Sequence, residues 1–204
     1  MAKHAGLIAG LGNPGPGYAN TRHNMGFMAL DALVEAIGSE KSCKAFDCGG
    51  DCVAASCLIM RSRPRYVLIK PMSYMNRSGI PVARASGRLE LDPKDLIVIH
   101  DEMDLPLGRI KLKYGGGTAG HNGVASIAEH LGTTDFYRLR LGIGRPEYSG
   151  QAADYVLERF DPGELETAEK TAKAAAQGLR IFAGRGYEQA AQFINSYRLD
   201  ESKD

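Results

Sequence analysis

The sequence lacks a strong net charge, a long hydrophobic run and a secretory signal. It carries 25 basic and 24 acidic side chains, a formal net charge of +1, so a polyanion would have to bind to a local basic patch. The sequence has no run of about 18 apolar residues, the length needed to cross a membrane. Its N-terminus has no apolar signal core. We therefore expect a cytoplasmic protein that makes no membrane contact.

The sequence also lacks an obvious nucleophile. There is no G-x-S-x-G turn, and the four cysteines form a cluster away from the other motifs, at Cys43, Cys48, Cys52 and Cys57. Their spacing differs from the C-x2-C pairs of common zinc sites, and alternate residues of a strand from Cys52 onward would face opposite ways. We expect free thiols here rather than a metal site or disulfides. A hydrolytic reaction would then use activated water.

Apolar segments alternate with helical periodicities along the chain. The sequence predicts strands over residues 5–11, 66–70, 96–100, 109–114 and 136–143, with a weaker strand or hairpin within 43–60. It predicts helices over residues 25–37, 76–89 and 122–131, and two more within 162–196 that are separated near 184–186. This order indicates an α/β fold with a twisted, mixed but largely parallel sheet flanked by helices. We expect residues 1–204 to form a single domain, with a flexible tail at about 197–204.

A glycine-rich segment follows the first strand. Residues 10–15, Gly-Leu-Gly-Asn-Pro-Gly, satisfy the dinucleotide pattern G-x-G-x-x-G, which is typical of oxidoreductases and needs a helix that begins inside the motif. Pro14 and Pro16 prevent a helix from beginning before about Ala19. The segment is therefore better interpreted as a polar loop that holds Asn13 and leads to His23.

His23 and Asp101 are the strongest candidates for acid–base chemistry. An imidazole titrates near neutral pH and can take a proton from water; a capping or merely exposed histidine is the alternative. Asp101 ends an apolar strand, where a carboxylate needs a partner, and it could hold the tautomer of His23. His100, Glu102 and Asp104 are other candidates for that role. The alternative interpretation of Asp101 is a structural acid that caps a turn or a helix.

Three asparagines lie in loops or at helix starts near the ends of strands: Asn13, Asn76 and Asn122. A carboxamide both donates and accepts hydrogen bonds, which suits it to hold an ester or amide and to place a water molecule. It can also stabilise an oxyanion. Asparagine is common in turns for structural reasons, so each residue taken alone is weak evidence.

Basic side chains repeat on two strands. Lys111 and Lys113 share one strand face, as do Arg138 and Arg140. The glycine-rich residues 115–123 precede a helix whose N-terminus could hold a phosphate. A solvated strand face is the alternative interpretation. A nucleic acid bound here would be held mainly through its phosphates.

Three motif blocks make the chain resemble the bacterial-type peptidyl-tRNA hydrolases over nearly its whole length. The first comprises residues 10–27, with Gly-Leu-Gly-Asn-Pro-Gly and Thr-Arg-His-Asn-Met-Gly-Phe. The second is Lys-Pro-Met-Ser-Tyr-Met-Asn-Arg-Ser-Gly at 70–79. The third is His-Asp-Glu-Met-Asp-Leu-Pro at 100–106, which continues through the triple glycine to Gly-His-Asn-Gly at 120–123.

The resemblance implies hydrolysis of the ester between a peptide and the terminal ribose of tRNA, with N-blocked aminoacyl-tRNA as the minimal substrate. It implies that His23 is the general base, that Asp101 orients it, and that Asn122 positions the water or stabilises the tetrahedral intermediate. It also implies a monomer that needs neither a metal nor an organic cofactor. The residues that the resemblance places at the peptide and tRNA are Asn13, Tyr18, Met75, Asn76, His121, Lys111, Lys113 and Arg140.

Two segments depart from the family pattern. Thr118-Ala119 replaces a stretch that is often His-Gly, and residues 43–65, which include the cysteines, have no family role that we can assign. Two rival functions remain, a catalytically silent RNA-binding relative and a dinucleotide-binding oxidoreductase. The full set of candidate residues favours an active hydrolase, in which the glycines of the first motif would leave room for peptide and ribose beside the backbone.

Overall fold

One mixed sheet organises the protein. The computed structural model describes residues 4–60, 64–146 and 148–199, and within them seven strands lie in the order β2-β3-β4-β1-β5-β7-β6. β1 pairs in parallel with β4 and β5, and β5 with β7; the remaining pairs are antiparallel. The strands are β1 Gly6–Gly10, β2 Cys43–Ala45, β3 Cys52–Cys57, β4 Tyr66–Pro71, β5 Leu96–Glu102, β6 Ile110–Tyr114 and β7 Tyr137–Gly142.

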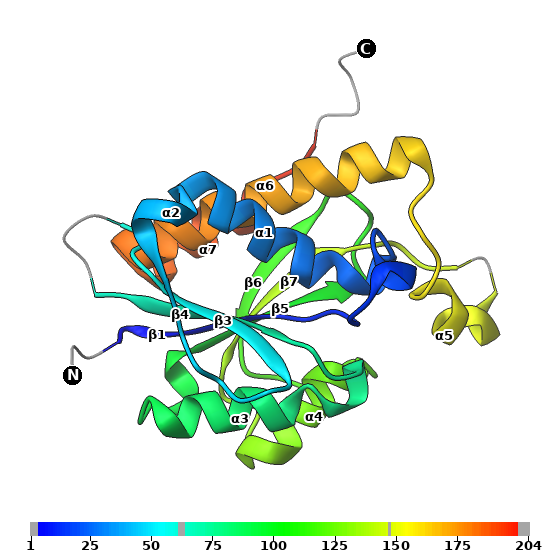
Figure 1. Cartoon of the computed structure of the whole chain (residues 1–204). Helices are drawn as coiled ribbons and strands as arrows, with labels where there is room; N and C mark the ends of the chain where they lie inside the picture. Colours follow the sequence, from blue (N-terminus) through cyan, green and yellow to red (C-terminus); the bar gives the residue numbers. More distant parts are fainter. Residues whose placement is uncertain (1–3, 61–63, 147, 200–204) are drawn as a thin grey trace.

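Helices cover both faces of this sheet (Figure 1). α1, α6 and α7 lie on one face and α3 and α4 on the other. The helices are α1 Met25–Ile37, α2 Ser39–Ser42, α3 Gly79–Arg88, α4 Asn122–Leu131, α5 Ala152–Tyr155, α6 Pro162–Arg185 and α7 Tyr187–Ser196. The predicted α/β fold with a largely parallel central sheet is thereby confirmed. Among the described residues, no helix is both long and apolar enough to span a membrane.

The alternation of side chains along the strands builds two cores. On β1, Ile8 belongs to the core under α1 and α6, whereas Leu7 and Ala9 belong to the core under α3 and α4. All five β1 residues are buried, as expected for a central strand covered on both sides. The central strands therefore hold their carboxyl ends in a fixed arrangement.

Most predicted boundaries agree with the structure to within a few residues. α1 ends at Gly38, which is left-handed with φ 67°, and Gly186 separates α6 from α7. Two short helices, α2 and α5, were not predicted. Asp101 does not end its strand, because β5 continues through Glu102, which pairs with Gly142 of β7. The predicted tail at 197–204 lies partly outside the described residues, and Arg198 forms an isolated β-bridge with Arg109.

The expectation of free thiols was wrong. The structure joins Cys43 to Cys57 and Cys48 to Cys52 by disulfides. Cys43 lies directly opposite Cys57 across the β2–β3 pair, so the two side chains share a face. The expectation considered only the alternation of side chains along one strand. That alternation says nothing about cysteines that face each other across two neighbouring strands. The second disulfide closes the turn between these two strands.

Two glycines of the first motif, Gly10 and Gly12, serve helix–strand packing rather than substrate. A Cβ atom on Gly10 would lie 2.5 Å from the carbonyl oxygen of Gly26, and one on Gly12 would lie 2.6 Å from the Phe27 ring. α1 thus packs closely against β1, which corrects the expectation of room for peptide and ribose at Gly10 and Gly12. Only Gly15 and Gly17 in this motif have open space around them. α1 begins at Met25, well beyond the motif, and this geometry does not fit a dinucleotide site.

Candidate active site

The candidate residues gather at the carboxyl ends of β1, β4 and β5. Asn13 follows β1, Met75 follows β4, and Asp101 lies in the last part of β5. Parallel strands end at the same edge of a sheet, which is where α/β proteins bind ligands. A cavity of about 220 Å³ lies here, and it is lined by His23, Asp101, His121 and Asn122 among others.

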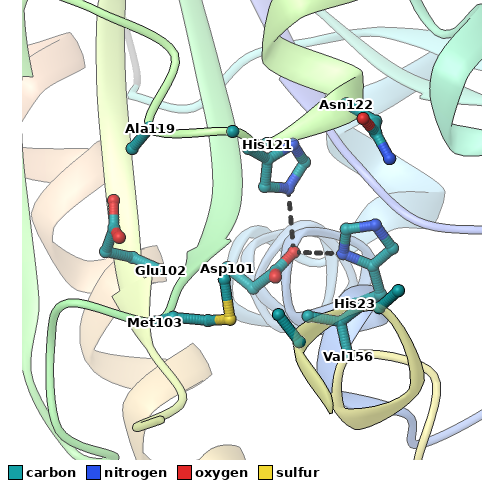
Figure 2. Close-up of a pocket in the computed structure, with 11 residues that line it drawn as sticks. His23, Asp101, Glu102, Met103, Ala119, His121, Asn122 and Val156 are labelled. Carbon is teal, nitrogen blue, oxygen red and sulfur yellow. Dashed lines mark hydrogen bonds and ion pairs between the residues drawn. The ribbon is translucent and has the colours of Figure 1, made fainter. Parts of the chain in front are cut away.

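His23 lies beside Asp101, and the two side chains are joined by a hydrogen bond (Figure 2). Its Nδ1 lies 2.8 Å from Oδ1 of Asp101, and both residues are buried. The Nδ1–H group donates a hydrogen bond to the carboxylate, so in the neutral form of the ring the free lone pair lies on Nε2. Nε2 of His121 lies 3.0 Å from the same Oδ1. The expected His–Asp contact is therefore present, with a second histidine added to it.

The electrostatics keep Asp101 ionised. Burial by itself would raise the pKa of this carboxyl, but the imidazoles of His121 and His23 and the hydrogen bonds they make lower it far below its ordinary range. A carboxylate that accepts several N–H groups holds its charge in this way. His100 behaves oppositely, because burial and then the neighbouring His121 lower its pKa to about 3. His100 is therefore neutral near pH 7, and its Nδ1 donates to the carbonyl oxygen of Asp101 at 2.7 Å.

The turn that carries His23 is fixed by contacts with residues far along the chain. The His23 N–H donates to the carbonyl of Val156 at 2.8 Å. The neighbouring Arg22 is buried; its guanidinium donates to Glu164 at 2.7 Å and lies 4.3 Å from the centre of the Tyr155 ring. These contacts join the His23 turn to α5 and to the first turn of α6. Residues of α5 form one wall of the cavity.

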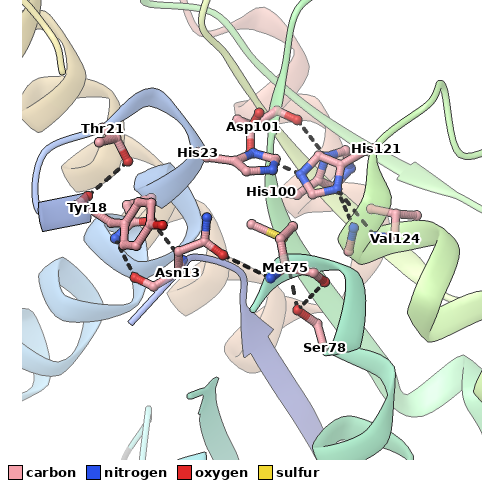
Figure 3. A network of polar contacts seen from close by, with 12 residues as sticks. Asn13, Tyr18, Thr21, His23, Met75, Ser78, His100, Asp101, His121 and Val124 are labelled. Carbon is pink, nitrogen blue, oxygen red and sulfur yellow. Dashed lines mark hydrogen bonds and ion pairs between the residues drawn. The ribbon is translucent and has the colours of Figure 1, made fainter. Parts of the chain in front are cut away.

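Asn13 links two loops (Figure 3). Its Oδ1 accepts the N–H of Met75 at 2.8 Å. Its main chain is held by Asn24, whose side chain accepts from Asn13 N at 2.8 Å and donates to Asn13 O at 3.1 Å. Because Oδ1 is occupied, the amide of Asn13 can offer its Nδ2 donors to a ligand. Asn13 also lines a second cavity of about 380 Å³, with Phe27, Met28 and Met72.

A basic face flanks the cavity that His23 and Asp101 line. Lys111 lies directly opposite Arg140, and Lys113 opposite Arg138, across the β6–β7 pair. Like charges in directly opposite positions destabilise a sheet, and an anionic ligand would relieve this repulsion. Lys113 and the two arginines line a cavity of about 270 Å³ together with Glu102, which accepts from Arg140 at 2.8 Å.

The two arginines of this face differ. Arg138 is buried, and its guanidinium donates to the backbone carbonyls of Gly116 and Gly117. It therefore supports the glycine-rich loop. Arg140 remains partly exposed, with 21% of its side chain accessible, and the exposed Lys111 and Lys113 lie on the same face.

The structure does not place every predicted residue in the same cavity. Asn122 is exposed and lines the cavity with His23 and Asp101. Asn76 is exposed on the short turn Met75–Arg77 and lines none of the three cavities described above. Tyr18 also lies outside them; its carbonyl accepts from the Thr21 hydroxyl at 2.9 Å. Met75 is buried beside Asn13.

Some residues of the site were not predicted from the sequence. Met103, Ala152, Ala153 and Val156 line the cavity with His23 and Asp101. Met103 lies within the third motif block, but an apolar side chain offers no reactive group that would single out any of the four. Among the described residues that line this cavity, none is serine, threonine or cysteine. Fold and site together define an α/β protein whose site combines a His–Asp pair with carboxamides and a basic face.

The comparisons with known proteins agree with this class. The family model for peptidyl-tRNA hydrolase matches residues 7–202. A peptidyl-tRNA hydrolase from Maridesulfovibrio salexigens is 47% identical over 200 residues, which cover 97% of each chain. One from Mycobacterium sp. strain KMS is 44% identical over 191 residues, covering 94% of this chain and 97% of the relative. The crystal structure of peptidyl-tRNA hydrolase from Acinetobacter baumannii has a TM-score of 0.86 at 33% identity and covers 97% of both chains. The chain belongs to the peptidyl-tRNA hydrolase family.

Proposed function

We propose that this enzyme, which hydrolyses peptidyl-tRNA, does so by direct attack of water with His23 as the general base. The observation that supports the assignment is the buried contact between His23 Nδ1 and Asp101, which leaves Nε2 as the proton acceptor. Nε2 takes a proton from water as the water oxygen bonds to the ester carbonyl carbon. General-base assistance of this kind contributes roughly 10²- to 10⁴-fold.

The carboxamides act on the reacting ester. Asn122, at the rim of the catalytic cavity, positions the water or donates to the oxyanion of the tetrahedral intermediate; one such donor contributes roughly 10²- to 10³-fold. The intermediate collapses as the bond between the carbonyl carbon and the ribose oxygen breaks. That oxygen takes the proton from the His23 imidazolium, so free tRNA and free peptide leave. Asn13 and Asn76, with Met75 and Tyr18, hold the peptide and the terminal adenosine.

The basic face holds the tRNA. Lys111, Lys113 and Arg140 contact phosphates of the acceptor arm, and this binding energy orients the ester at His23. We propose a monomer as the active form. Since the substrate is a product of translation, we place the enzyme in the cytoplasm.

The reaction needs no metal. Three possible ligand atoms lie within 4.8 Å of one another, one each from His23, Asp101 and His121. Such a group could hold a metal ion. However, the two imidazole nitrogens are already engaged with Asp101, and a metal would have to replace both hydrogen bonds. A transition-metal chelator such as 1,10-phenanthroline, used with Mg²⁺ retained for the tRNA, should leave the rate unchanged. Loss of activity that zinc restores would contradict this point.

A matched substrate pair tests the function. Purified protein should release the acyl group from N-acetyl-aminoacyl-tRNA and spare the aminoacyl-tRNA with a free amino group. Equal rates on both substrates would contradict the specificity for peptidyl-tRNA. Binding of tRNA without hydrolysis would instead favour the silent RNA-binding relative.

A further inference from the structure

His121 makes contacts in two directions from the position just before α4. Its Nδ1 accepts the backbone N–H groups of Gly123 and Val124, at 3.1 and 3.3 Å, and so caps the helix. On the other side of the ring, Nε2 lies 3.0 Å from Oδ1 of Asp101. We propose that His121 is a positioning residue that fixes Asp101 relative to the N-terminus of α4 and thereby aligns His23 with Asn122.

The cap determines the tautomer of His121. Backbone N–H groups can only donate, so Nδ1 must be the unprotonated nitrogen of the ring. The proton of the neutral imidazole then lies on Nε2, the atom that faces Asp101. One ring therefore satisfies two free N–H groups at the start of a helix and donates to the carboxylate that orients His23.

The two histidines share a single oxygen. Oδ1 of Asp101 accepts from His23 at 2.8 Å and from His121 at 3.0 Å. The carboxylate cannot rotate away from His23 without breaking both hydrogen bonds. Loss of the His121 donor would leave Asp101 with one bond at this oxygen and would concentrate its negative charge on His23.

The surroundings hold the His121 ring in place. Its centroid lies 4.9 Å from that of His23 and 4.8 Å from that of His100. His100 is neutral near pH 7, and the nearby Glu102 is paired with Arg140. The titratable groups in direct contact with Asp101 Oδ1 are thus His23 and His121. Asn122 follows His121 directly in the chain, so the position of this ring also sets where Asn122 begins the helix.

Two substitutions separate the two contacts. His121→Asn keeps a side-chain acceptor near the position of Nδ1, and asparagine is a favoured helix cap, but it removes the donor to Asp101. His121→Gln places an amide nitrogen near the position of Nε2 and removes the cap. Thermal unfolding, the dependence of kcat/KM on pH, and NMR titration of the His23 imidazole are measured for both variants and the parent protein.

The proposal predicts opposite patterns for the two variants. His121→Asn should keep the parent Tm, lower kcat by about tenfold with KM within about twofold, and shift the acid limb of the pH profile to higher pH, since a less satisfied Asp101 attracts the proton to His23. His121→Gln should lower Tm by about 2–4 °C and keep the position of the acid limb. Parent-like kcat and pH profile in His121→Asn, or parallel loss of Tm and activity in both variants, would overturn it.

This inference rests on the proposed role of His23, yet the two can fail separately. The Tm values and the NMR titration need no substrate. If the parent protein did not hydrolyse N-acetyl-aminoacyl-tRNA, the proposed function would fail while the NMR shift in His121→Asn could still be observed. If the parent were active and His121→Asn titrated like the parent, only the role of His121 would be rejected.

Discussion

The side chain of Asn24 holds the main chain of Asn13 from both sides. It accepts the Asn13 N–H at 2.8 Å and donates to the Asn13 carbonyl at 3.1 Å, and both residues are buried. The polar loop after β1 is therefore anchored to the residue that immediately precedes α1. This anchor fixes the amide of Asn13 at the second cavity, which it lines with Phe27.

Removal of this anchor should weaken substrate binding. Asn24→Ala leaves the N–H and carbonyl of Asn13 without their partner, which costs about 1–3 kcal/mol per buried group, and it lets the Asn13 amide move. We expect kcat/KM to fall by about tenfold, mainly through KM, in steady-state assays below the melting temperature. Gln189→Ala, which removes an exposed amide from α7, is the control. An unchanged KM in Asn24→Ala would show that the position of Asn13 does not depend on this contact.

The basic face makes a prediction about salt. Lys113→Gln and Lys111→Gln should each weaken tRNA binding and reduce the slope of log K against log salt by about 0.7–0.9, the value for one phosphate contact. Lys44→Gln removes an exposed lysine from β2, at the other end of the sheet, and should leave the slope unchanged. The measurement is tRNA binding between about 50 and 200 mM salt. Equal slopes for all three variants and the parent would make Lys111 and Lys113 ordinary solvated charges.

His100 should make the folded state sensitive to acid. Its pKa is lowered to about 3 by burial and then by His121, whereas in the unfolded chain it is about 6.5. Below pH 6.5 the unfolded state binds a proton that the folded state does not, so stability falls as the pH falls. The expected loss from this residue is about 2 kcal/mol between pH 7 and pH 5.

Urea unfolding at both pH values checks this prediction. His100→Asn retains a donor near Nδ1 for the Asp101 carbonyl but cannot titrate. This variant should lose about 2 kcal/mol less than the parent over the same interval. Identical pH dependence in the two proteins would mean that His100 does not hold its neutral form against protonation.

The disulfides should contribute measurably to stability. By loop length, the bond between Cys43 and Cys57, which are 14 residues apart, should stabilise the fold by about 3 kcal/mol. Urea unfolding with and without dithiothreitol should show this difference in the parent. A double variant with Cys48→Ser and Cys52→Ser keeps the Cys43–Cys57 disulfide and should retain most of this stabilisation. Four thiols that react with iodoacetamide in native protein purified without reductant would contradict both disulfides.

The sequence was sufficient for the features that depend on local chemistry. Glycine at positions 38 and 186 and the helical periodicity after Asn122 located helix ends. The loop after the first strand pointed to His23, and the apolar run before Asp101 placed that residue near the carboxyl end of β5. Features that depend on strand pairing could not be predicted. Cys43 meets Cys57 through the register of β2 and β3, and His121 reaches Asp101, 20 residues earlier, through the path of the glycine-rich loop.

The role of His23 is tested most directly by single-turnover hydrolysis of N-acetyl-aminoacyl-tRNA at saturating enzyme. His23→Ala should lower the rate by at least about a hundredfold while tRNA binding persists. His130→Ala, which removes an exposed histidine from the last turn of α4, should keep the parent rate. A near-parent rate in His23→Ala would contradict the assignment of His23 as the general base.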